Sequence, residues 1–218
     1  LFSLDPYEVS SYLRSSIVGL PTHLVDELLY EWDYAGILGS DFHKKLEDAS
    51  YERGYEISPF TEEKYNTIKL PKEYDNQSAH DHLINLEDGY YPELLVFDYS
   101  MKQSKTVVTM IDKCFIKTDE HGRRIVDVDD IKTPKNKPYA SKDKKMDPPL
   151  DELYDNTEEK YKLQVCFGAK LMGTHGFFPR YCAFTHFLNY DENKAKIYMA
   201  KYNEELMTNF QKAWKKIK

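Results

Sequence analysis

Long hydrophobic runs are missing from this chain of 218 residues. The longest apolar stretches, such as ELLVFD at 93–98, hold only a few apolar residues, whereas a membrane-spanning helix needs about 20. We therefore expect no membrane partner. The start of the chain has neither a basic segment nor an apolar core, so we expect no targeting signal.

Cysteine is also scarce. The three cysteines, Cys114, Cys166 and Cys182, lie far apart, and none forms a C-x-x-C pair. This spacing favours neither a zinc ribbon nor a disulfide framework. Internal repeats are absent as well. We expect a reducing, intracellular setting, the cytoplasm of a bacterium or of an infected host cell.

The composition is that of one compact domain, with 41% hydrophobic, 14% aromatic and 31% charged residues. The net charge of −7 argues against a polyanionic partner, but the charge is unevenly placed. Between residues 132 and 145 six lysines stand against one aspartate, and four more lysines lie within the last seven residues. A solvated loop and tail would show the same pattern.

The periodicity of apolar residues predicts the order of the elements. Residues 1–90 read as mostly helical, 91–200 as the core of the domain, and 201–218 as a C-terminal helix. The expected helices are 24–34, 41–53, 72–86, 158–172 and 202–217, and the expected strands are 91–99, 106–117, 123–133, 181–190 and 194–200. This order predicts a single α/β domain over 1–218, a central mixed sheet flanked by helices.

Two of these strands form a hairpin that turns at 119–122. If it closes near His121, Cys114 faces Val128, Ile116 faces Val126, and Asp112 faces Asp130. Alternation places Met110 and Asp112 on the apolar face with Cys114 and Ile116, and places Asp130 and Lys132 on the same face as Val126 and Val128. The sequence therefore predicts two acids and a lysine at the rim of a buried face.

Two like charges at such a distance repel, and burial makes each more costly. A divalent cation is the simplest compensation, because carboxylates and a backbone carbonyl, here that of Ile131, are the hard oxygen ligands that Mg²⁺ prefers. An ordinary Asp–Lys pair on an exposed face is the alternative.

The motifs resemble those of the PD-(D/E)XK nuclease superfamily, in particular its RecB-like exonuclease branch. The matching segments are MID with Asp112, DIKT with Asp130 and Lys132, and KLQVCFGAKL with Gln164. Upstream, GSDFHKKLE with His43 and YYPELLV with Glu93 are similar to further motifs of this branch.

The resemblance implies a restriction-endonuclease-like core and a Mg²⁺- or Mn²⁺-dependent deoxyribonuclease that uses one or two ions. His43, Glu93, Asp112, Asp130 and the Ile131 carbonyl would hold the metal. Lys132 would assist the attacking water, and Gln164 would orient Lys132 or the phosphate. The chain departs from the branch at Gly168, where a tyrosine is usual, and its three cysteines cannot hold the iron–sulfur cluster of some relatives.

The lysine-rich segment that follows Lys132 is the expected DNA-binding element. Lys135, Lys137 and Lys142 would contact phosphates and Tyr139 would stack on a base. An exonuclease acting in recombination, repair or replication, with DNA and possible recombination or replication proteins as partners, is the leading interpretation. An endonuclease or junction resolvase of the same fold, and a non-catalytic nucleic-acid-binding module, remain alternatives. Oligomeric state stays open.

Overall fold

The computed structural model describes residues 22–70, 83–98, 107–133, 138 and 140–214. Two compact units make up the chain, Leu1–Lys45 and Leu46–Lys218. The boundary between them falls inside the first described helix, α2 (Thr22–Arg53). Both sheets and the remaining helices belong to the second unit.

Helix α2 corrects the expectation of two helices, 24–34 and 41–53. It runs without a break through Gly36 and Gly39. A glycine inside a helix costs only about 1 kcal/mol relative to alanine, which the flanking helical residues can offset. Most of the helix expected at 72–86 lies outside the described residues.

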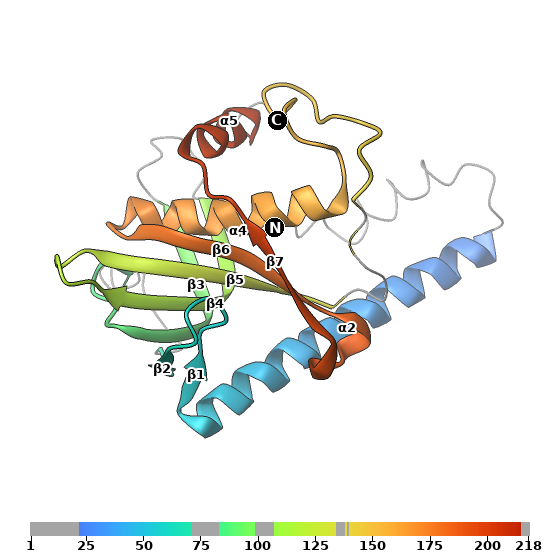
Figure 1. Ribbon diagram of the computed structural model, residues 1–218. Helices are drawn as coiled ribbons and strands as arrows, with labels where there is room; N and C mark the ends of the chain where they lie inside the picture. Colours follow the sequence, from blue (N-terminus) through green and yellow to red (C-terminus); the bar gives the residue numbers. More distant parts are fainter. Residues whose placement is uncertain (1–21, 71–82, 99–106, 134–137, 139, 215–218) are drawn as a thin grey trace. The chain divides into compact units, whose positions relative to one another are not determined.

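A mixed sheet of five strands forms the centre of the second unit, in the order β3-β4-β5-β6-β7 (Figure 1). Its strands are β3 (Gly89–Asp98), β4 (Val107–Thr118), β5 (Arg124–Lys132), β6 (Phe178–Phe187) and β7 (Ala195–Ala200). Only β5 and β6 pair in parallel. The predicted α/β class with a central mixed sheet is confirmed. Two short strands, β1 (Tyr55–Ile57) and β2 (Lys64–Asn66), form a second sheet that the sequence did not predict.

Helix α4 (Thr157–Thr174) connects the parallel strands β5 and β6, which cannot be joined by a tight turn. The side chain of Asn156 caps its start by accepting a hydrogen bond from the Glu159 backbone N–H at 2.8 Å. The helix continues past Gly173, the expected stop, and the chain turns instead at Gly176, whose φ of 87° suits glycine. Short 3-10 turns, η1 (Leu188–Tyr190) and η2 (Glu192–Lys194), lead into β7. Helix α5 (Glu204–Trp214) is the last described element.

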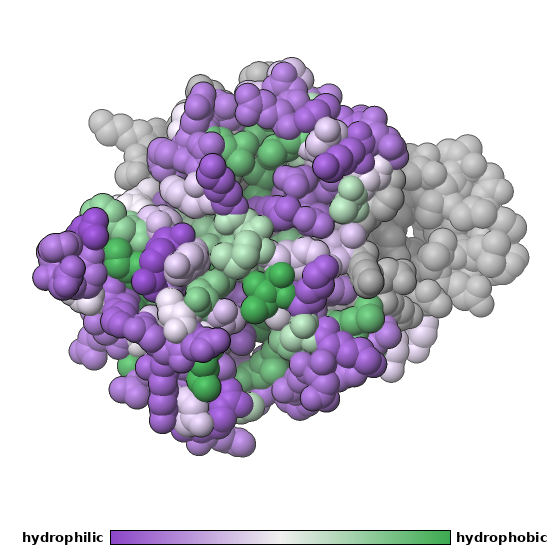
Figure 2. Space-filling view, viewed as in Figure 1, coloured by the Kyte–Doolittle hydropathy of each residue, from purple (hydrophilic) through white to green (hydrophobic). Residues whose placement is uncertain are grey.

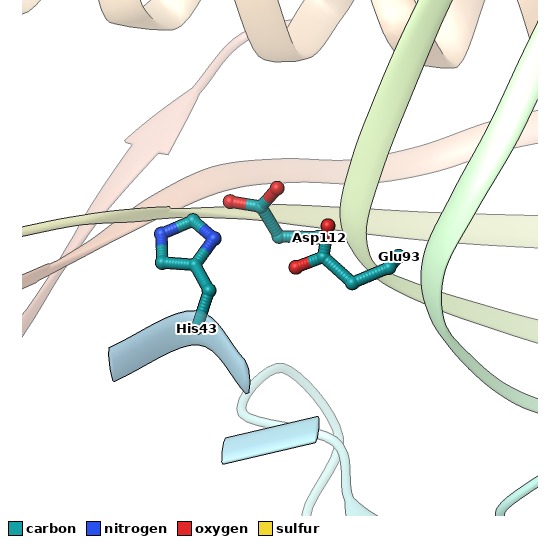
Figure 3. A group of neighbouring side chains, drawn as sticks. All are labelled: His43, Glu93 and Asp112. Carbon is teal, nitrogen blue, oxygen red and sulfur yellow. The ribbon is translucent and has the colours of Figure 1, made fainter. Parts of the chain in front are cut away.

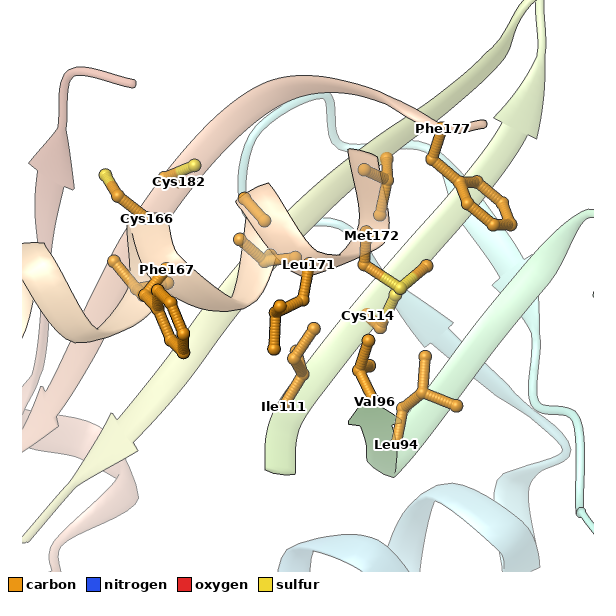
Figure 4. Close-up of a cluster of buried hydrophobic side chains, with 14 of the residues drawn as sticks. Leu94, Val96, Ile111, Cys114, Cys166, Phe167, Leu171, Met172, Phe177 and Cys182 are labelled. Atoms are coloured by element: carbon orange, nitrogen blue, oxygen red, sulfur yellow. The ribbon is translucent and has the colours of Figure 1, made fainter. Parts of the chain in front are cut away.

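The main core lies between α4 and the five-stranded sheet (Figure 4). Leu163, Cys166, Phe167 and Leu171 all face it, as the helical spacing predicts. The three cysteines are buried and unbridged. None of the described helices is both long and apolar enough to cross a membrane.

Gly168, where the resemblance would place a tyrosine, lies against a tightly packed part of the sheet. A Cβ at Gly168 would lie 3.1 Å from Cγ1 of Ile111 on β4, closer than most such contacts. The position therefore faces the tightly packed sheet. A tyrosine in its place would have to displace the core.

Candidate active site

The β4–β5 hairpin has the predicted register near its turn, but the ladder ends at Lys113–Asp129 and does not include the expected pair of Asp112 with Asp130. Cys114 pairs with Val128 and Ile116 pairs with Val126. At the turn, Oδ1 of Asp119 accepts hydrogen bonds from the backbone N–H groups of His121 and Arg123, both at 2.9 Å. This turn fixes the register of both strands.

Side-chain alternation changes along β3 and β4 at one point. Tyr91 is buried toward α4, and so are Leu94 and Val96, so the buried positions on β3 shift from odd to even numbers. The opposite strand shifts from Cys114 to Ile111 in the same place. Met110, expected on the buried face with Asp112, is instead 46% exposed, because the shift moves it to the other side.

Glu93 and Asp112 lie at this point. The pairing of β3 and β4 passes from Pro92–Lys113 to Leu94–Ile111, and the ladder omits the two acids between these pairs. Glu93 has a φ of 51°, in the left-handed region that non-glycine residues seldom adopt. Such strain costs on the order of 1 kcal/mol or more and clusters at functional sites. The positive φ of Glu93 is the local cause of the shift in alternation.

The two carboxylates converge as a result. A carboxylate oxygen of Glu93 and one of Asp112 lie within 4.8 Å of each other (Figure 3). Asp112 is 8% exposed and Glu93 is half-buried. Two anions this close in a partly dry site repel strongly unless a cation lies between them. The sequence named both residues, but on separate motifs, and the fold brings them together.

Asp112 is also anchored to β5. Its Oδ2 accepts a hydrogen bond of 2.6 Å from the backbone N–H of Ile131. Asp112 therefore reaches the backbone between Asp130 and Lys132. This bond holds the acid against the D-x-K segment and places the Ile131 peptide at the same site.

Asp130 and Lys132 form a buried ion pair on the α4 side of the sheet. The side chain of Lys132 is 17% exposed and its Nζ lies 5.0 Å from the ring centre of Tyr161. Gln164 donates from Nε2 to Oδ1 of Asp130 at 3.4 Å. The predicted residues Asp130, Lys132 and Gln164 are thus in contact, and Gln164 orients the acid of this pair. Asp130 is not in the 4.8 Å group that contains Glu93 and Asp112.

His43 lies on α2, in the first compact unit, and is half-buried (Figure 3). The predicted DNA-binding residues Lys135, Lys137 and Tyr139 lie outside the described residues. Lys142 is exposed, with its Nζ 5.8 Å from the ring centre of Tyr154. Its role in DNA binding stays a prediction.

Two buried acids that the sequence motifs did not indicate lie on the other face of β5. Asp127 binds Arg180 through both oxygens, at 2.9 and 2.5 Å. Asp129 accepts a 2.7 Å hydrogen bond from Thr185 Oγ1, while its Oδ1 has no hydrogen-bond partner among the described residues. Burial raises the pKa of Asp129 to about 7, although Lys113 and the Thr185 hydrogen bond act to lower it. The run DVDD at 127–130 could have indicated these buried acids, because consecutive residues of a strand place acids on both of its faces.

Asp129 should make the fold less stable as pH rises. Its pKa is raised in the folded state, so folding favours the protonated form, and this stabilisation is lost between about pH 4 and the folded pKa of about 7. A tenfold change in proton affinity corresponds to about 1.4 kcal/mol. We expect Asp129→Asn, in buffer with EDTA, to raise the free energy of unfolding at pH 8 and to flatten its pH dependence, measured by urea denaturation.

Asp127→Asn is the matched control, because Asp127 lies two residues away on the same face but has Arg180 as its partner. Asp127→Asn should lower the free energy of unfolding at acidic pH and at pH 8 alike. An Asp129→Asn variant that is equally destabilised at pH 8 would contradict the raised pKa.

Comparison with known proteins gives no further information on the site. No protein-family model, curated protein or solved structure matches the chain. The resemblance to PD-(D/E)XK nucleases therefore rests on the motifs alone.

Proposed function

We propose that the chain is a metal-dependent deoxyribonuclease that hydrolyses phosphodiester bonds, and that it acts as an exonuclease in DNA recombination, repair or replication. The observation that carries the proposal is the convergence of Glu93 and Asp112, with Asp112 anchored to the peptide between Asp130 and Lys132. Five residues from separate motifs thus lie in two adjacent clusters of the second unit: Glu93 with Asp112, and Asp130 with Lys132 and Gln164.

The donor set fits Mg²⁺ or Mn²⁺. Carboxylates and a backbone carbonyl are hard oxygen ligands, and the cysteines that a softer metal would favour are buried in the core. Glu93, Asp112 and the carbonyl of Ile131 would hold the ion, with Asp130 as a further ligand. A bound divalent cation supplies Lewis-acid activation of water and charge neutralisation on the phosphate.

Lys132 is the residue proposed to act on the reacting groups. Its ammonium lies beside Asp130 and Tyr161 in a side chain that is only 17% exposed, so it is held in place. There it can hold the attacking water and stabilise the negative charge that develops on the phosphate. Gln164 positions this pair through Asp130.

The test compares linear and circular DNA, incubated with Mg²⁺ or with EDTA. An exonuclease should degrade linear DNA to short products, leave covalently closed circles intact, and lose all activity in EDTA. Nicking of circles with Mg²⁺ would instead indicate the endonuclease alternative. No products with any divalent ion, combined with retention of DNA, would contradict the proposal in favour of a binding module.

A further inference from the structure

Two rows of side chains cross the sheet from the proposed site toward its edge. In the first row Asp130 of β5 pairs with Phe184 of β6, and Phe184 pairs with Tyr198 of β7. In the second row Lys132 pairs with His186, and His186 pairs with Lys196. Strand β7 is at the edge of the sheet. Because neighbouring strands lie about 4.8 Å apart, each row spans about 10 Å.

The first row contains a continuous set of aromatic rings. Tyr161 of α4 meets Phe184 edge to face at 5.3 Å, and Phe184 stacks on Tyr198 with ring centres 4.7 Å apart and planes within 2°. Phe184 is fully buried, whereas Tyr161 and Tyr198 are half-buried. The two tyrosines are therefore the accessible ends of a packed aromatic row.

A lysine lies over each of these two tyrosines. Lys132 Nζ is 5.0 Å from the ring centre of Tyr161, and Lys196 Nζ is 4.5 Å from that of Tyr198. Lys196 is exposed, and no carboxylate of the described residues is within ion-pairing distance of it. These contacts place both lysines and all three rings on one side of the sheet. Figure 2 shows one face of the molecule, on which hydrophilic and hydrophobic residues are intermixed.

We infer that these rows bind the single-stranded end of the DNA substrate, with a phosphate on Lys196 and an unpaired base on Tyr198. This inference rests on the proposed function and specifies its substrate. Alternating basic and aromatic side chains are the usual surface for single strands, because lysines follow the backbone while rings stack on bases of any sequence. A duplex hides its base faces and cannot use the tyrosine in this way.

The energies allow the exchange. A base that stacks on an aromatic side chain is held more strongly than a lysine that lies over a solvent-accessible ring. Lys196 can therefore move from the ring to a phosphate while a base takes its place. The strand would extend from the scissile phosphate near Lys132 to Lys196 at the edge, and would contact only the ends of the rows, because Phe184 and His186 between them are buried.

The experiment measures binding of the full chain to a short fluorescent oligothymidylate by anisotropy, in EDTA so that nothing is cleaved, over a range of salt concentrations. Tyr198→Leu should weaken binding by about fivefold or more. Lys196→Ala should reduce the slope of log affinity against log salt by about 0.7, the value for one phosphate contact on a single strand. Binding of a blunt duplex should change little.

A second tyrosine–lysine pair provides matched controls. Lys64 Nζ lies 3.7 Å from the ring centre of Tyr55 on the separate β1–β2 sheet. Tyr55→Leu and Lys64→Ala make the same chemical changes and should leave single-strand binding unaltered. Tyr198 packs on Phe184, so thermal melting is needed to check that Tyr198→Leu is folded. Lys196 is exposed, and its substitution by alanine tests the inference without disturbing this packing.

The outcomes separate this inference from the proposed function. If the parent protein cleaves DNA with Mg²⁺ but Tyr198→Leu and Lys196→Ala bind single strands as the parent does, the rows are not the binding surface and the nuclease proposal stands. The inference would also be overturned if the Tyr55 and Lys64 variants lost as much single-strand affinity as the Tyr198 and Lys196 variants. If the parent neither binds nor cleaves DNA, the proposed function itself fails.

Discussion

Asp112→Asn should reduce DNA cleavage about a thousandfold, because it removes a charged ligand from a site whose ion contributes several kcal/mol to catalysis. Asparagine has the shape of aspartate and can still accept the hydrogen bond from the Ile131 N–H. The fold should therefore remain intact, and the loss should appear in the rate of product formation under saturating Mg²⁺.

The same variant should be more stable than the parent in EDTA. Without an ion, Asp112 and Glu93 repel each other across less than 4.8 Å, and the substitution removes that repulsion. Added Mg²⁺ should raise the melting temperature of the parent more than that of the variant. The control is Asp151→Asn, an exposed acid outside the site, which should match the parent throughout. Parent-like cleavage by Asp112→Asn would show that the site is assigned wrongly.

Lys132→Ala should also abolish most cleavage, by about a hundredfold or more, as expected for loss of a preorganised charge at a developing anion. Its effect on metal binding should be opposite to that of Asp112→Asn. The Lys132 ammonium competes with an ion for Asp130, so removing it should leave Mn²⁺ affinity unchanged or higher. Cleavage rate and Mn²⁺ titration on the same sample separate the two roles.

Lys117→Ala is the control for this prediction. Lys117 lies on the same hairpin and is also paired with a carboxylate, that of Glu63 at 2.6 Å. Unlike Lys132, it lies close to the turn of the hairpin, away from the proposed site. It should cleave DNA at the parent rate. Weakened Mn²⁺ binding by Lys132→Ala would mean that the lysine supports the metal site and does not act on the substrate.

Much of the sheet could be predicted because alternation of apolar residues is strong there. The β4–β5 register followed from the facing pairs Cys114–Val128 and Ile116–Val126, since a slip by one residue would expose all of them. Strands β1 and β2 have three residues each, too few to show a period. The continuous helix α2 was missed because two glycines looked like breaks.

The geometry of the site could be predicted only in part. The motifs named Glu93 and Asp112, but nothing in the sequence signals a positive φ at a glutamate, and this residue causes the shift that exposes Met110. The burial of Asp129 depends on which groups cover the second face of the sheet. The pairing of Lys132 with His186, and of His186 with Lys196, required knowledge that β5 and β6 are parallel neighbours.

The most direct test of the proposed metal site is calorimetric titration of the metal-free protein with Mn²⁺. The parent should bind one or two ions, and Asp112→Asn and Glu93→Gln should each lose most of the affinity. If the parent binds no Mn²⁺, or if the Asp112 and Glu93 variants bind it as tightly as the parent, these two acids do not form a metal site and the hydrolytic mechanism is wrong.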